Sequence, residues 1–458
     1  MPKKPSSSDL TRREAVQIAG AATAAVAITR RAKAAPAIQT VQAANSVVNY
    51  GVIGTGGRGQ YHLKHFKNVD GGKCVAICDI DDAALQKGLA EAPDKPQTYK
   101  DYRELLSRKD VDAVVIATPL YTHFPITKDA LLAGKHVFCE KSLVFKAEEV
   151  HELRQLANER PKQVLQVGLQ RRYSEFYQTA RQMIEKGMIG DVTHIYAQWH
   201  RNPGWTWRKN NWRLFKEFSG GLTAELASHQ IDVADMMFGA HPEFVVGVGG
   251  IDYHKDGRTV YDNIQLIFSY PKGRKLMYSS ISTNKHLCMF QGQRTEFGEL
   301  IMGTQGTIEI TVGTDNEPAL ALWYYEPGPK VTDVKKGNEK EKAVGTSATL
   351  LSTGAGGRPL PVLLAKDQVS EKDSFLSREM KYARRWLYSK GVMVPEETRN
   401  PVDVQLDEFL NSVRTGKRPK ADLEVGLADS SAVILANLAM EEGRRVYMIE
   451  IEKMGKKA

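Results

Sequence analysis

The pair Glu140-Lys141 directly follows a short apolar run, His136 to Cys139, which predicts a buried strand. A residue that ends a parallel strand lies at the carboxyl edge of the sheet, where ligands bind in open α/β folds. A lysine there can donate a hydrogen bond to a hydroxyl and stabilise negative charge on its oxygen. Glu-Lys pairs also occur on ordinary surfaces, so it is the place after a strand that makes Lys141 a candidate catalytic residue.

Glu225 and His229 form a second candidate, within a segment from Leu222 to Phe238 whose spacing predicts a helix. Residues four apart share a helix face, and a carboxylate beside an imidazole raises its basicity and fixes its tautomer. We therefore predict that Glu225 tunes His229 as a general base, with Asp232 near the same face. A helix with ordinary polar pairs is the alternative. We predict no metal site, because a second pair of ligands is missing.

A glycine-rich turn, GTGGRG, follows the apolar run Val47 to Ile53 and precedes a helical segment from Gln60 to Lys67. Strand, tight turn and helix start together predict a dinucleotide-binding site, although glycine-rich turns by themselves are common. Gly54 permits the turn, Gly56 lets the backbone approach a pyrophosphate, and Gly59 lets the helix pack close to the strand. Unpaired N–H groups at the helix N-terminus would bind the phosphates. The cofactor residues predicted in this turn are Gly54, Thr55, Gly56, Gly57, Arg58 and Gly59.

A second predicted strand, Lys73 to Cys78, ends at Asp79, which lies about 20 positions after Gly59. A carboxylate there accepts hydrogen bonds from ribose hydroxyls and repels a 2′-phosphate, which favours NAD over NADP. The alternative is that Asp79 caps the following helix, but Asp81 or Asp82 could perform that task.

Two regions with different patterns of predicted strands and helices must position these residues. From residue 47 to 168, short apolar strands alternate with helices, which predicts a doubly wound parallel sheet, a Rossmann domain. From 169 to 400, strands that follow one another without helices predict an α+β domain with a large, mostly antiparallel sheet. Residues at about 326–375 are rich in Gly, Pro, Lys and Ser and are predicted to form a surface insertion. Residues 401–458 are predicted to form C-terminal helices and a tail.

Residues 1–36 have the features of an export leader: a basic start, an alanine-rich apolar stretch from Ala15 to Ile28, and an A-x-A cleavage motif. Arg12-Arg13 resembles the twin-arginine signal. We therefore expect an export machinery to carry the protein to the periplasm or another exported location. After removal of the leader, and beyond a linker at 37–46, we expect a soluble protein without a membrane span. An amphipathic N-terminal extension is the alternative.

Composition excludes few classes of protein. The chain has 458 residues, of which 42% are hydrophobic and 26% charged, as is ordinary for a globular protein. The net charge of +9 is concentrated in the leader, so we expect no nucleic-acid partner. The four cysteines form no C-x-x-C pair, and we expect them to be small buried residues.

Together these residues resemble the Gfo/Idh/MocA family, named in part for glucose–fructose oxidoreductase and inositol 2-dehydrogenase, over about residues 47 to 312. The glycine turn matches the family's cofactor loop. Thr118-Pro119, followed by His123, resembles its T-P-x-x-x-H motif after the third strand, and Glu140-Lys141 matches its E-K-P motif. The resemblance implies that Thr118, Pro119, His123, Glu140 and Lys141 belong to the cofactor site.

The segment from Gly220-Gly221 to Asp232 resembles the family's G-G-G…D-x-x-x-H-x-x-D helix. The resemblance implies a catalytic pair, Lys141 and His229, in which His229 takes a hydroxyl proton while hydride passes to the nicotinamide. Two positions depart from the pattern. Glu225 stands where the family has aspartate, and Ser142 replaces the proline, so the match does not carry a cis geometry after the lysine.

The resemblance also makes Arg172 and Asp232 candidate substrate residues. Trp212 and Arg213 belong to an aromatic, basic stretch from Arg201 to Phe218 that suits a polyhydroxylated ring; a lid packed on the core is the alternative. The implied activity is oxidation of a carbohydrate hydroxyl by a homo-dimer or homo-tetramer.

Export adds a constraint, because an exported enzyme has no nicotinamide pool to exchange with. The cofactor, NAD rather than NADP, would then be tightly bound and regenerated in place by a second carbonyl substrate. One alternative is the family's NAD-dependent glycosidase chemistry, by oxidation, elimination and reduction. Another is a non-catalytic sugar-binding protein.

Overall fold

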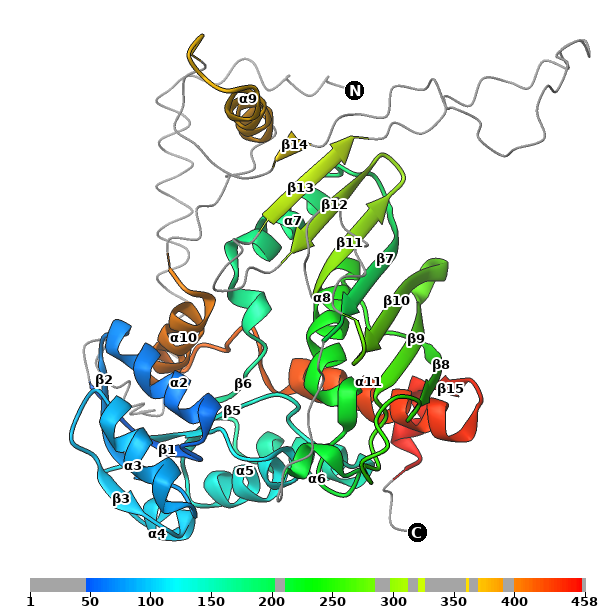
Figure 1. Cartoon of the computed structure of the whole chain (residues 1–458). Helices are drawn as coiled ribbons and strands as arrows, with labels where there is room; N and C mark the ends of the chain where they lie inside the picture. Colours follow the sequence, from blue (N-terminus) through cyan, green and yellow to red (C-terminus); the bar gives the residue numbers. More distant parts are fainter. Residues whose placement is uncertain are drawn as a thin grey trace, which may run out of the picture. The chain divides into compact units, whose positions relative to one another are not determined.

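The fold was analysed in a computed structural model, which describes residues 47–201, 211–284, 297–311, 320–325, 360–361, 370–389 and 399–454. The predicted leader at 1–36, the linker at 37–46 and most of the predicted insertion lie outside these residues. Element labels are those of Figure 1.

The first sheet has six parallel strands in the order β3-β2-β1-β4-β5-β6, which confirms the predicted Rossmann domain. Its strands are β1 (Val48–Ile53), β2 (Gly72–Cys78), β3 (Gln97–Tyr99), β4 (Ala113–Ile116), β5 (His136–Cys139) and β6 (Leu165–Val167). Only β3 was not predicted, because an edge strand of three residues has no apolar run. The ends of the four central strands are in register, since Ile53 pairs with Cys78 and Ile116, and Ile116 with Cys139. The residues that follow these strands therefore meet at one edge.

Helices cover both faces of the first sheet (Figure 1). The helices of this region are α2 (Gly57–His65), α3 (Asp82–Glu91), α4 (Tyr102–Leu106), α5 (His123–Leu132), α6 (Ala147–Asn158), α10 (Pro401–Thr415) and α11 (Leu423–Glu442). The two C-terminal helices return to this sheet. Helix α10 buries Leu406 and Phe409 in the same apolar cluster as Tyr50 of β1, on the face that α2 and α3 also cover. Helix α11 packs on β6 and α6, on the other face.

The second sheet has nine strands in the order β14-β13-β12-β11-β7-β10-β9-β8-β15. All its pairings are antiparallel except that of β7 with β10, which confirms the predicted α+β domain. The strands are β7 (Val192–Trp199), β8 (Phe244–Gly250), β9 (Asn263–Tyr270), β10 (Arg274–Ile281), β11 (Phe297–Gly303), β12 (Gly306–Thr311), β13 (Leu320–Tyr325), β14 (Leu360–Pro361) and β15 (Val446–Tyr447).

Helices α7 (Glu175–Glu185) and α8 (Ser228–Phe238) pack on one face of this sheet, and α9 (Phe375–Ser389), which was not predicted, contacts β14. On the face toward α8, Ile195 and Ala197 of β7 are fully buried. The side chains that alternate with them point to the other face, where Tyr196 is 37% exposed and Ile267 is 42% exposed. One face of the sheet thus belongs to the core, and the other is open around Tyr196 and Ile267.

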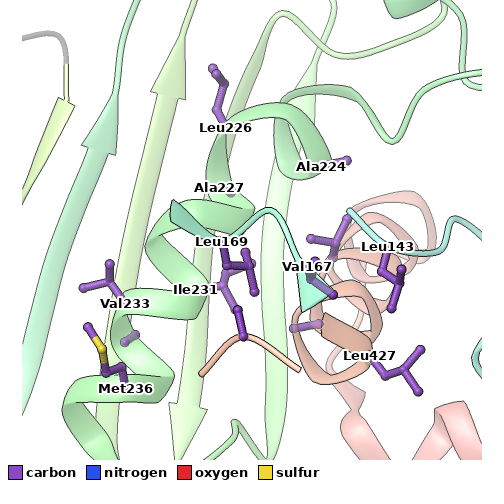
Figure 2. Packing of buried hydrophobic residues seen from close by; sticks show 14 of the residues in the cluster. Leu143, Val167, Leu169, Ala224, Leu226, Ala227, Ile231, Val233, Met236 and Leu427 are labelled. Atoms are coloured by element: carbon purple, nitrogen blue, oxygen red, sulfur yellow. The ribbon is translucent and has the colours of Figure 1, made fainter. Parts of the chain in front are cut away.

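A continuous apolar core joins the two sheets through α8 and α11 (Figure 2). Leu143 and Val167, from the first domain, lie beside Leu427 of α11, while Leu169 lies beside Ile231 of α8. Among the described residues, α11 alone is long and apolar enough to cross a bilayer by length and composition, but its side chains belong to this core.

The helix predicted over residues 222–238 is interrupted at its start. Residues Thr223–Ala227 form a π-helical turn, and the regular helix α8 begins only at Ser228. The backbone after Lys141 also differs from the expectation, because the Lys141–Ser142 peptide bond is cis although residue 142 is serine.

Candidate active site

The glycine turn after β1 is shaped by two close approaches. Gly54 has a φ of 88°, in the left-handed region that favours glycine, and its N–H donates to the Cys78 carbonyl at 2.8 Å. A Cβ atom on Gly59 would lie 1.9 Å from the carbonyl oxygen of Gly54, so only glycine lets α2 start this close to the strand. Helix α2 begins after Gly56, which carries no capping side chain, so its first N–H groups can bind phosphate.

Asp79 is half-buried at the end of β2, beside this turn. Its Oδ2 accepts hydrogen bonds from the Thr55 N–H at 2.7 Å and from Thr55 Oγ1 at 3.3 Å. Helix α3 is capped by Asp81, which accepts from the Ala84 N–H, and not by Asp79. The Asp79 carboxylate is thus fixed next to the glycine turn, in the place where a ribose hydroxyl can donate to it. Turn, helix start and carboxylate together fit a dinucleotide.

Glu140 anchors the glycine-rich helix to the end of β5. Its Oε1 accepts from Arg58 Nε at 2.7 Å and from His62 Nε2 at 2.7 Å. Arg58 Nη2 also donates to Gln170 Oε1 at 2.8 Å. Burial would raise the pKa of the Glu140 carboxyl, but Arg58 and His62 hold this pKa well below its usual range. Glu140 and Arg58, both predicted to contact the cofactor, therefore bind each other, and Glu140 orients the strand end that carries Lys141.

Lys141 reaches across to the π-helical turn. Its Nζ donates to the carbonyl oxygens of Ala224 at 3.1 Å and Glu225 at 2.7 Å. Turns of π-helix are frequent at functional sites, because they change which backbone groups a helix presents. Burial lowers the pKa of the Lys141 amine, while the charges of Glu225 and Glu140 oppose this effect. An amine with three hydrogen-bonding directions, two of them used, has one left for a substrate oxygen.

His229 lies one turn beyond the carbonyls that hold Lys141. Its side chain is buried, and its Nδ1 has no hydrogen-bond partner. The ring centroid is 5.6 Å from that of Trp199. Burial and the nearby charge of Lys141 hold the pKa of the imidazole well below its usual value. Lys141 therefore binds the segment that carries His229, and the lowered pKa keeps the imidazole neutral.

The predicted pairing of Glu225 with His229 is wrong. Glu225 Oε2 accepts instead from Arg213 Nε at 3.1 Å, and no hydrogen bond between Glu225 and His229 occurs in the structure. The π-helical turn is the physical reason, because its wider turn destroys the i, i+4 alignment of a regular helix. Burial and the charge of Lys141 lower the pKa of His229, which the predicted pairing would have raised.

Arg172 and Asp232, both predicted to contact substrate, form an ion pair with each other at 2.7 Å. Asp232 is only 2% exposed, so it serves to hold Arg172. The adjacent Arg171, which was not predicted as a site residue, lies closer to the aromatic ring beside His229. It forms a buried ion pair with Glu299, and its guanidinium carbon lies 5.6 Å from the Trp199 ring centroid.

Trp212 and Arg213, predicted to contact substrate, contact each other. Arg213 stacks over Trp212, with its guanidinium carbon 4.3 Å from the ring centroid, and 40% of its side chain is exposed.

His123 lies between two carbonyl oxygens, those of Ser142 at 2.8 Å from Nδ1 and Thr118 at 2.9 Å from Nε2. Burial lowers the pKa of the His123 ring, so a neutral ring donates to one carbonyl at a time. His123 therefore ties the two loops together.

The Thr118-Pro119 loop follows β4 and is half-buried. A Cβ atom on Gly54 would lie 2.8 Å from Thr118 Cγ2, so this loop borders the glycine turn. In the aromatic stretch, residues 202–210 lie outside the described residues. No group of three or more His, Cys, Asp or Glu side chains in the described ranges is placed to hold a metal ion.

Helix α11 supports the loop that follows Lys141. Ser430 Oγ accepts hydrogen bonds from the Leu143 N–H at 3.1 Å and the Val144 N–H at 3.4 Å. The neighbouring Asp429 is 1% exposed, and neither of its carboxyl oxygens has a hydrogen-bond partner. Burial and the charges of Asp232 and Asp235 hold the pKa of Asp429 well above its usual range.

Family comparison decides what kind of protein this site belongs to. Two family models match: "Oxidoreductase family, NAD-binding Rossmann fold" over residues 48–169, and "Oxidoreductase family, C-terminal alpha/beta domain" over residues 181–448. The chain belongs to the Gfo/Idh/MocA oxidoreductase family. The glycine turn, Asp79 and Lys141 lie within the NAD-binding match, and His229 lies within the C-terminal match.

Individual relatives match only part of the sequence of this Gfo/Idh/MocA chain. An uncharacterized oxidoreductase of Synechocystis is 33% identical over 192 residues, 41% of this chain and 50% of that protein. The inositol 2-dehydrogenase of Rubrobacter xylanophilus is 31% identical over 267 residues, 57% of this chain and 70% of that protein. In fold, the scyllo-inositol dehydrogenase from Lactobacillus casei with bound NAD(H) and scyllo-inositol has a TM-score of 0.62 at 17% identity, covering 88% of this chain and 99% of that one.

Several site residues of this Gfo/Idh/MocA protein could not be predicted from the sequence. His62, Arg171 and Trp199 carry no local signal, because their partners are distant in the chain. Asp429 did carry one: a lone acid inside the apolar stretch of a predicted helix is costly to bury unless it is neutralised.

We expect Asp429 to make the stability of this Gfo/Idh/MocA protein depend on pH. Its folded-state pKa is raised, so above the unfolded value of about 3.9 the folded state keeps a proton that the unfolded state releases. The contribution of Asp429 to the free energy of unfolding is complete below that pH and is lost as the pH rises toward and through the folded pKa. We expect Asp429→Asn to raise the free energy of unfolding at pH 7–8 by roughly 1 kcal/mol or more, and to have little effect near pH 4.

Thermal denaturation across this pH range tests the prediction. The matched control is Asp407→Asn on α10, whose carboxylate is 40% exposed and pairs with Arg399. It should shift stability little and equally at all pH values. A gain for Asp429→Asn that is independent of pH would contradict a protonated Asp429.

Proposed function

We propose that this chain oxidises a hydroxyl group of a sugar or related polyol with a tightly bound nicotinamide cofactor, NAD rather than NADP. The observation that carries the proposal is the placement of Lys141, whose Nζ binds the carbonyls of Ala224 and Glu225 on the segment that leads into His229. The family match to an NAD-binding domain and the inositol dehydrogenases among its relatives support it. Asp79, as an acidic side chain beside the turn, supports NAD.

The residues divide the work as follows. The first turn of α2 and the Asp79 carboxylate would hold the dinucleotide, which would supply a hydride acceptor for the carbon that bears the hydroxyl. Lys141 donates to the substrate oxygen and orients it. His229, kept neutral by burial and by the charge of Lys141, accepts the hydroxyl proton. Glu225 acts through Arg213 and through its own carbonyl, not on the imidazole.

The sharpest test starts from the purified protein as expressed. Denaturation should release NAD(H), identified by chromatography. A panel of sugars and cyclic polyols is then added to the native protein, and reduction of the prebound cofactor is followed by absorbance. We expect at least one member to reduce it within a single turnover. Bound cofactor that no polyol reduces would favour the non-catalytic alternative. Glycoside cleavage without net cofactor reduction would favour the glycosidase alternative.

Location and assembly complete the proposal. The basic, twin-arginine-like leader supports export to the periplasm, with in-place regeneration of the cofactor by a second carbonyl substrate. The open face of the second sheet supports a homo-dimer or homo-tetramer. There Tyr196, Met277 and Ile267 form a row across three neighbouring strands. Fractionation of cells and light scattering of the mature protein test these two points.

A further inference from the structure

Most of the cationic side chains around the site have a carboxylate partner. Each pair neutralises its own charge, so none of these arginines has a full charge to spare for a ligand. The pairs are Arg58 with Glu140, Arg171 with Glu299, Arg172 with Asp232, and Arg213 with Glu225.

Arg201 is different. It follows β7, where its N–H donates to the Ile281 carbonyl at 2.9 Å, and its side chain is half-buried. Its guanidinium carbon lies 5.4 Å from the ring centroid of Trp199. Its Nε is buried without a hydrogen-bond partner, and the described residues place no carboxylate within ion-pair distance of it. A buried guanidinium N–H without an acceptor is costly, so an unfilled partner is implied.

The strand places Arg201 on the side of the catalytic residues. Side chains alternate along β7, so Ala197, Trp199 and Arg201 share the inner face that α8 covers. Trp199 lies within 5.6 Å of the His229 ring, centroid to centroid. Two more buried nitrogens here lack partners, Trp199 Nε1 and His229 Nδ1. One unpartnered nitrogen therefore belongs to the indole ring of Trp199, and the other two belong to side chains beside this ring.

The chemistry of these groups defines what they could bind. Guanidinium and indole N–H groups only donate hydrogen bonds. A planar guanidinium matches the paired oxygens of a carboxylate or phosphate. We propose that the substrate carries an anionic group, a carboxylate or a phosphate, which Arg201 and Trp199 bind beside His229. The inference rests on the proposed function for the reaction, but the binding that it describes can be measured without turnover.

Binding is therefore the first readout, on the full-length holoprotein. The matched ligands differ in whether they carry an anionic group. One set is glucose, glucuronate and a glucose phosphate, and the other is myo-inositol and its monophosphate. Dissociation constants come from quenching of tryptophan fluorescence and from thermal shift. We expect one anionic class to bind the wild type at least about 10-fold more tightly than its neutral partner. Arg201→Gln should weaken anion binding about 10- to 100-fold and leave neutral ligands unchanged. Arg201→Lys should restore part of the loss.

The control variant is Arg181→Gln on α7, an exposed arginine paired with Glu185, which should change nothing. Equal affinity for anionic and neutral partners in every pair would overturn the inference, as would an Arg201→Gln variant with unchanged preference. Inorganic phosphate that binds as tightly as the sugar phosphate would also overturn it, by showing an adventitious anion only. If anions bind through Arg201 but no ligand reduces the cofactor, the inference stands and the proposed function fails.

Discussion

Lys141→Met should lower the rate of reduction of the prebound cofactor by about 10²- to 10⁴-fold, the usual contribution of a positioned proton-transfer or oxyanion-stabilising group. The methionine keeps the length and apolar stem of the side chain but loses the amine that donates to the Ala224 and Glu225 carbonyls. Substrate then loses its hydrogen-bond donor at the reacting oxygen. Single-turnover absorbance with a saturating polyol measures the effect, since it excludes changes in release of product.

The matched control is Lys128→Met on α5, a half-buried lysine that pairs with Glu152. It should leave the rate unchanged. Circular dichroism and thermal denaturation of both variants separate loss of chemistry from loss of fold. Because burial lowers the pKa of Lys141, the wild-type rate should also show a pH limb below the usual lysine value. A Lys141→Met variant within about 10-fold of wild type would remove Lys141 from the mechanism.

Gly59→Ala should abolish cofactor retention and destabilise the protein by at least about 3 kcal/mol. The added Cβ would lie 1.9 Å from the Gly54 carbonyl oxygen and 2.9 Å from its carbonyl carbon, which are backbone atoms of the turn. A backbone cannot rotate away as a side chain can, so α2 must move off the strand. That movement displaces the N–H groups at the helix start. Cofactor content after purification and denaturant unfolding measure the two effects.

Gly57→Ala provides the comparison within the same helix. It is the first residue of α2, and an added Cβ would meet nothing within 4 Å. The apo-protein should keep its stability or gain up to about 1 kcal/mol, since alanine favours a helix over glycine. A Gly59→Ala protein that retains both cofactor and stability would show that the turn and helix do not meet as described.

The glycine turn and most strands of both sheets could be predicted from the sequence, because each depends on neighbours in the chain. The exceptions, β3, β14 and β15, have only two or three residues and are too short to show a pattern. Apolar runs set the strands, and the spacing of Gly54 and Gly59 encodes a local turn whose φ and close contact the structure confirms. Lys141 could be located at a sheet edge for the same reason, since it directly follows a strand.

Tertiary structure decided the partners. Glu225 and His229 are aligned only in an ideal helix, and the π-helical turn that separates them depends on packing. Arg171 rather than Arg172 lies beside Trp199, because Glu299, distant in the chain, pairs with the first of the two. Ser430 supports the loop after Lys141 from 287 positions away. Spacing along a chain determines which residues share a turn or a strand, but only folding determines which charges and hydrogen-bonding groups meet.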